Sequence, residues 1–288
     1  MTRRTGIAVT LCALLAACGG GDDGGNAAVG KTFTYGEGTE LAPSSPAALA
    51  AQEHVAGALS LEGSTAPDAA YGFADIQGAM DALFDGIYLG ALRQASPAPA
   101  MALAAVRRAA SNQQGSLVDS PAFDETCVVT TDTSVTFKGC TTTESEGGES
   151  ITATLDGSFS LSADHRTLTW ALSVRGSLSS YEGSVSISYD YSGEITVTES
   201  TIRGNLLAQL GVSGTVDGHS DGIGMAVAIL VDVTYADTCT TLVTGGTYEG
   251  KLVWTRRPSG YSAEELPNQG VLITWESCGN GSIAFSTN

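Results

Sequence analysis

Apolar and polar residues alternate along the second half of the chain. The clearest run extends from Ile223 to Tyr235, where every second residue is apolar. A period of two with β-branched and aromatic residues is typical of strands that bury one face. Shorter runs of the same kind are Ile151–Leu161, Leu168–Val174, Val185–Tyr191, Ile195–Val197, Tyr248–Trp254, Val271–Trp275 and Ile283–Phe285.

Glycine-rich and polar turn signals separate these runs. They are Gly147–Gly148, Ala163–His165, Ser192–Gly193, Asp217–Gly218, Gly245–Gly246, Pro258–Gly260 and Gly279–Gly281. Short connections join antiparallel neighbours. We therefore predict an antiparallel domain of about eight to ten strands.

The first half of the chain is rich in alanine and follows a helical period instead. Ser45 before Pro46 is a helix start, a stronger helix is expected over Ala74–Arg93, and a short third helix is expected over about Pro99–Ser111. The fold class expected is mainly β (α+β). Two geometries cover the apolar face of such strands: a closed β-barrel, or an open curved sheet on which the N-terminal Ala-rich helical segment packs.

The start of the chain has the layout of an export signal. Arg3 and Arg4 precede the apolar segment Gly6–Leu15, which is too short to span a bilayer. The four residues Leu15-Ala16-Ala17-Cys18 then resemble the lipobox of bacterial lipoproteins. An ordinary secretory signal cut after Ala17 is the alternative.

The lipobox resemblance implies a covalent lipid on Cys18 and anchoring of the mature chain in a membrane. Gly19 stands where the family's inner-membrane retention signal would be Asp, which implies the outer membrane, with its periplasmic or cell-surface side left open. The expected organisation is a signal peptide over 1–17, a flexible Gly/Asp tether over 18–30, a helical segment over 31–120 and an antiparallel β domain over 121–288.

Charge restricts the possible partners. The chain has 13 basic and 31 acidic residues and a net charge of −18. A nucleic-acid partner is disfavoured because phosphate backbones are bound by Lys and Arg. Docking on anionic lipid is disfavoured as well, so the acyl chains would have to provide the membrane attachment.

Of the six cysteines, Cys12 lies in the expected signal peptide and Cys18 would carry the lipid, so four remain. An even number in an exported protein suggests two disulfides, with three possible connectivities. We expect Cys127 to pair with Cys140, across a hairpin that turns near Asp132–Ser134, and Cys239 to pair with Cys278. A zinc site is disfavoured because the chain has no closely spaced cysteine pair.

Two sequence patterns could suggest a ligand site, and neither is supported by its context. Residues Gly25–Thr32 match a phosphate-binding loop, but no strand pattern precedes them and no helical pattern follows. Asp217 and Asp221 could bind calcium, but the further carboxylates of a full site are missing. We expect no cofactor and no metal.

Candidate catalytic side chains are scattered. The three histidines, His54, His165 and His219, accompany neither a G-x-S-x-G elbow nor an H-E-x-x-H motif. Among the acidic residues, Asp81 and Asp85 fit an exposed helix face, and a solvated sheet face accounts for Glu182, Asp190, Glu194, Glu199 and Asp232. The aromatic residues Trp170, Tyr189 and Trp254 are expected in the core, or around a ligand cavity in a roomy barrel.

The sequence thus suggests a lipid-anchored envelope lipoprotein with no catalytic residues. It would act as a non-enzymatic binding or structural module for an apolar ligand or a partner protein. An exported hydrolase with dispersed active-site residues is the first alternative. A transmembrane β-barrel is the second, because alternating strands of about ten residues are also its signature.

Overall fold

The computed structural model describes the β domain and parts of the N-terminal region. The described residues are 28, 30–45, 48, 49, 52, 58, 59, 125–146, 149–180, 183–216, 219–239 and 241–288. Within them, no helix is long and apolar enough to cross a bilayer.

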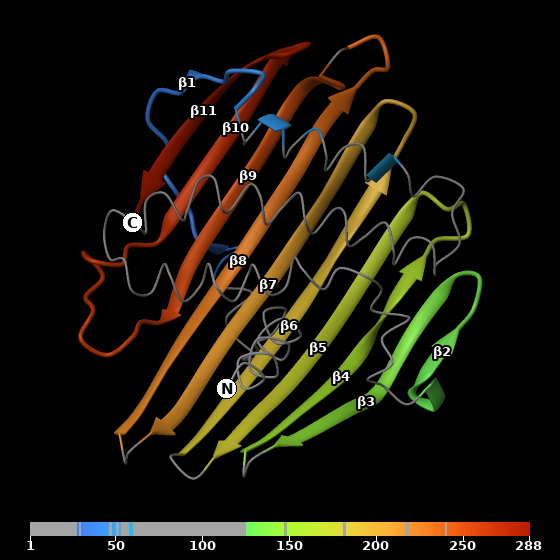
Figure 1. The fold of residues 1–288 in the computed structure, drawn as a ribbon. Coiled ribbons are helices and arrows are strands. Elements are labelled where there is room, and N and C mark those ends of the chain that lie inside the picture. Colours follow the sequence, from blue (N-terminus) through green and yellow to red (C-terminus); the bar gives the residue numbers. More distant parts are fainter. Residues whose placement is uncertain are drawn as a thin grey trace.

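The β domain is one antiparallel sheet of eleven strands (Figure 1). Its spatial order is β1-β11-β10-β9-β8-β7-β6-β5-β4-β3-β2, so that from β2 to β11 each strand pairs with the next in sequence. The strands are β1 (Thr39–Glu40), β2 (Val128–Thr130), β3 (Ser134–Glu146), β4 (Glu149–Leu161), β5 (Thr167–Ser180), β6 (Gly183–Val197), β7 (Thr201–Val216), β8 (His219–Tyr235), β9 (Val243–Arg256), β10 (Gln269–Ser277) and β11 (Asn280–Thr287), with the 3-10 turn η2 (Glu125–Cys127) before β2.

The sheet is open. Its edges are β1 and β2, which do not pair with each other. This decides between the two geometries that the hydrophobic pattern allowed. The apolar face of an open sheet must be covered by other parts of the chain rather than by closure.

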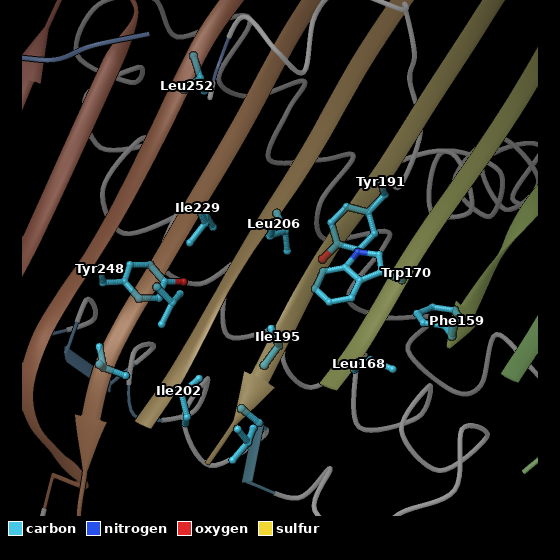
Figure 2. Close-up of a cluster of buried hydrophobic side chains, with 14 of the residues drawn as sticks. Phe159, Leu168, Trp170, Tyr191, Ile195, Ile202, Leu206, Ile229, Tyr248 and Leu252 are labelled. Carbon is cyan, nitrogen blue, oxygen red and sulfur yellow. The ribbon is translucent and has the colours of Figure 1, made fainter. Parts of the chain in front are cut away.

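The core lies on one face of the sheet. Figure 2 shows labelled side chains from β4 to β9, Phe159 to Leu252, projecting on this side. Trp170 and Phe159 are the largest fully buried side chains, and Tyr189 and Trp254 belong to the same cluster. We call this the core face. The core positions expected for Trp170, Tyr189 and Trp254 are confirmed.

Two expected turns are wrong, because Ser192–Gly193 lies inside β6 and Gly245–Gly246 lies inside β9. Gly193 faces the core, where a Cβ atom would overlap the indole of Trp170. Gly246 has a φ of 102° and sits beside an irregularity in the pairing of β8 with β9. These glycines permit close packing within strands, a role that composition alone cannot distinguish from a turn.

Strand β7 has no counterpart among the expected strands. Its residues Leu206, Leu207 and Ala208 are consecutive and apolar, which obscures the period of two. Leu206 is buried in the core, whereas Leu207 packs in a second cluster. The alternation fails here because both faces of the sheet are covered.

At Ser45, where a helix start is expected, the structure has the hydrogen bonds of a helix N-terminus. The Ser45 side chain accepts from the amide of Ala48 (3.3 Å), and its carbonyl accepts from the amide of Leu49 (3.0 Å). Ala48 and Ala58 reach the core face. The helices expected over Ala74–Arg93 and Pro99–Ser111 lie outside the described residues.

Both cysteine pairs lie at disulfide distance in the expected connectivity. Cys127 and Cys140 fix η2 and β2 against β3, and their sulfurs are 2.00 Å apart. Cys239 and Cys278 join the β8–β9 connection to the β10–β11 turn. Such bonds indicate an oxidising compartment outside the cytoplasm.

Candidate binding groove on the polar face

The face opposite the core, here called the polar face, carries a small apolar patch at its centre. Ala226 and Ala228 of β8 and Val253 of β9 point to this face and pack with Ala28, which has no exposed surface. Small side chains on β8 leave the space that a crossing chain needs. The tether expected over 18–30 is therefore already packed on the sheet at residue 28.

Residues 31–41, here called the strap, continue from this patch to the sheet edge. Phe33 is buried over Gly270 of β10, where a Cβ atom would meet the phenyl ring at 2.8 Å. Farther along, the hydroxyl of Ser286 donates to the carbonyl of Thr34 (2.8 Å). The strap then pairs with β11 as β1 at the outer edge (Figure 1).

After β1, the chain crosses to the other side of the sheet, because Leu41 is buried in the core cluster. The strap thus wraps around the β11 edge and contacts both faces. This arrangement also pairs the part of the β11 backbone edge around Ser282 and Ile283, which would otherwise be open to pairing with another strand.

A polar triad holds the strap to the sheet. The Tyr35 hydroxyl donates to Oε1 of Glu249 (2.8 Å), and Nζ of Lys251 lies 3.3 Å from Oε2 of the same carboxylate. The Lys251 side chain is only 8% exposed, so its ammonium depends on Glu249 for charge compensation. Burial, and then the hydrogen bond to Glu249, raise the pKa of Tyr35.

A groove of about 470 Å³ opens on the polar face next to this triad and crosses the strands from β6 to β10. Direct cross-strand neighbours form its long axis: Glu194 pairs with Asn205, Asn205 with Leu230, and Leu230 with Glu249. At strand spacings of ~4.8 Å, this row is about 14 Å long. Thr196, Asp232 and Thr247 line the groove as well.

The charges of the groove are largely paired within it. Nε of Arg203 donates to Oδ1 of Asp232 (2.9 Å), from the directly opposite position on the next strand. Thr169 donates weakly to Glu194 (3.5 Å). The exposed carboxylate of Glu194 and the side chains of Asn205 and Thr196 suit a ligand or partner that donates hydrogen bonds or carries positive charge. Leu230, Val231 and Leu272 make the rest of the lining apolar.

Several residues singled out in the sequence lie on this face or in nearby turns. Asp190, Glu194 and Asp232 are on the polar face, as expected, and Glu199 is in the β6–β7 turn. Of these, the groove brings together Glu194 and Asp232.

The remaining candidates are not brought into the groove. His165 is in the β4–β5 turn with a φ of 57°. Asp221 accepts from the amides of Gly222 (2.7 Å) and Ser259 (3.1 Å), so both its carboxylate oxygens bind backbone. Outside the described residues lie Cys18, His54, Asp81, Asp85, Glu182 and Asp217, and the side chain of His219 is likewise not described.

Sequence reasoning missed the residues that hold the strap. Tyr35, Glu249 and Lys251 were not candidates, because Tyr35 is 214 residues away from Glu249 in the chain. A local signal existed in β8, where Ala226, Ala228 and Leu230 are apolar at the positions between the core residues. Apolar residues at both parities indicate a strand covered on both faces.

Among the described residues, no three His, Cys, Asp or Glu side chains are grouped as a metal ion would require. The comparisons with known proteins add no assignment: no family model, curated protein or solved structure matches the chain.

Proposed function

We propose that this protein is a lipid-anchored lipoprotein of the bacterial outer membrane whose open sheet is a non-enzymatic binding module. The lipobox ending at Cys18 supports the anchor. The observation that carries the binding role is the groove on the polar face, which crosses five strands and is lined by both hydrogen-bonding and apolar groups. Its carboxylates Asp232 and Glu249 are engaged by cations of the fold itself.

The proposed partner binds at the groove rather than inside the sheet. The core face is filled by buried side chains such as Trp170 and Leu168, which favours a role for this face in stability. We also propose that the Ala-rich segment before residue 121 completes the cover of this face, as its helical pattern suggests.

The anchor is tested with Cys18→Ala. The wild-type protein is expected to enter the detergent phase after phase separation, and its N-terminal peptide is expected to carry the mass of the acyl chains. The variant should remain in the aqueous phase. The lipoprotein assignment would be wrong if the variant still partitioned into detergent.

The binding role is tested by photo-crosslinking in intact cells. A photoreactive amino acid is placed at Thr196, inside the groove, and as a matched control at Asp164, in the exposed β4–β5 turn. We expect crosslinked adducts, to lipid or to protein as identified by mass spectrometry, from the groove position that the turn position does not give. Identical crosslinking patterns from the two positions would contradict a binding site in the groove.

A further inference from the structure

The position of Ala28 fixes where the N-terminal chain reaches the fold. Its neighbours Ala226 and Ala228 are close to the middle of β8, which has 17 residues. At about 3.3 Å per residue, β8 is ~56 Å long, so each end of the strand is about 28 Å from this patch. The chain coming from Cys18 therefore meets the sheet at the centre of its polar face.

The length of chain between Cys18 and Ala28 limits how the sheet can be oriented. Residues 19–27 lie between them, so Cys18 is at most ~36 Å from Ala28 in any conformation. From β8 to the β2 edge there are six strand spacings, or about 29 Å. If the strand ends or the β2 edge faced the membrane, residues 19–27 would have to be almost fully extended. If the polar face or the nearer β11 edge faced the membrane, this segment would need to span a much shorter distance.

Charge distinguishes the polar face from the β11 edge. Three ion pairs lie on the polar face, Arg175–Asp190, Arg203–Asp232 and Lys251–Glu249, so its three cations are matched by carboxylates, while Asp156 and Glu194 are exposed beside them. At the β11 edge, Glu37 and Glu40 of the strap are exposed. Bacterial membranes carry anionic lipid, which repels an acidic surface more strongly than one whose charges are paired.

We propose that the polar face is the membrane-facing surface of this protein and that its partner is the layer of phospholipid headgroups. This inference rests on the proposed anchor at Cys18. The groove lies beside the landing point of the tether, because Leu230 follows Ala228 by two residues on the same face. The exposed carboxylate of Glu194 in this groove suits the ammonium group of phosphatidylethanolamine, which donates charge-assisted hydrogen bonds.

The orientation is tested with the lipidated full-length protein in vesicles of phosphatidylethanolamine and phosphatidylglycerol. A fluorophore is attached to one new cysteine in each of three variants: Thr196→Cys in the groove, Glu40→Cys at the β11 edge and Asp164→Cys in the β4–β5 turn. Labelling is done without reductant so that the two disulfides stay closed. A small fraction of the lipid carries a nitroxide quencher on its headgroup. We expect the strongest quenching at position 196 and the weakest at position 164.

Two results would overturn the orientation. Stronger quenching at position 40 than at 196 would place the β11 edge on the membrane, and equal quenching at all three positions would show that no face is preferred. Detergent partitioning of the same samples distinguishes a failure of the proposed orientation from a failure of the proposed anchor. Failure to partition overturns the anchor and the inference together, whereas partitioning without selective quenching overturns the orientation alone.

A longer tether provides the matched control. Inserting about twenty Gly and Ser residues after Gly25 roughly triples the length of the connecting chain and leaves the sheet unchanged. If the short connection orients the sheet, the difference in quenching between positions 196 and 164 should fall severalfold. An unchanged difference would contradict the argument from tether length.

Discussion

The hydroxyl of Tyr35 donates a 2.8 Å hydrogen bond to the carboxylate of Glu249 across 214 residues of chain. The same carboxylate compensates the buried ammonium of Lys251. Glu249 of β9 thus binds the strap to the sheet and also compensates the buried charge of Lys251.

Tyr35→Phe should destabilise the strap without unfolding the sheet. A hydrogen bond to a charged group contributes about 1.5–3 kcal/mol, so we expect a loss toward the lower end of that range. Hydrogen exchange of the amides in residues 31–41 and chemical unfolding measure it. The comparison variant is Ser286→Ala, which removes a neutral hydrogen bond to Thr34 and should cost about 1 kcal/mol or less. An equal loss in the two variants would argue against a special role for the Tyr35–Glu249 bond.

Stability should fall at alkaline pH. Burial raises the pKa of Tyr35 and of Tyr248 above their ordinary value of 10.0. A group whose pKa is higher in the folded state contributes stability that is complete below the unfolded value and is lost as pH rises through the folded one. Thermal unfolding from pH 8 to 11 should show a decline beginning near pH 10 that is shallower in Tyr35→Phe. A parallel decline in wild type and variant would contradict this assignment.

Removing the charge of Glu249 should cost far more than removing that of Asp232. Glu249→Gln keeps an acceptor for Tyr35 but leaves Lys251, 8% exposed, without a counter-charge, at a cost of about 3 kcal/mol. The control Asp232→Asn breaks a pair whose side chains are 59% and 67% exposed, so its cost should be below ~1 kcal/mol. Equilibrium unfolding in urea decides, and similar losses would mean that the ammonium of Lys251 finds another partner.

Gly193→Ala should disrupt the core at Trp170. The added methyl group would overlap both the indole ring and the backbone oxygen of Asn205, and such overpacking costs about 1–3 kcal/mol or more. Tryptophan fluorescence and thermal unfolding report the change. Gly36→Ala is the control, because no atom lies within 4 Å of the position of its added Cβ. A variant at position 193 as stable as this control would show that the strand can shift to make room.

The two disulfides should contribute unequally. Cys239 and Cys278 are separated by 39 residues, and Cys127 and Cys140 by 13. By loop-closure entropy, replacing both cysteines of the longer loop with serine should cost about 4 kcal/mol, against about 3 kcal/mol for the shorter loop. Unfolding of the two double variants measures the difference. A reversed order would indicate that strain or residual structure in the unfolded chain outweighs loop entropy.

The sequence by itself determined the antiparallel β domain and its core face, and it favoured the observed cysteine pairing among three possible ones. The period of two from Ile223 to Tyr235 reflects a local property of strands, since neighbouring side chains point to opposite faces. The hairpin near Asp132 brings the Cα atoms of Cys127 and Cys140 to 5.2 Å of each other by short-range geometry. The anchor at Cys18 and the helices of the first half remain predictions.

Only the tertiary structure decided that the sheet stays open and that the strap crosses its polar face. Closure depends on whether the edge strands β1 and β2 meet, which no local pattern encodes. The contacts of Ala28 with β8 and of Tyr35 with Glu249 join segments about 200 residues apart in the chain. A groove formed by five strands and bordered by a distant segment arises from such long-range packing, so its residues could not be identified as a site from their order in the sequence.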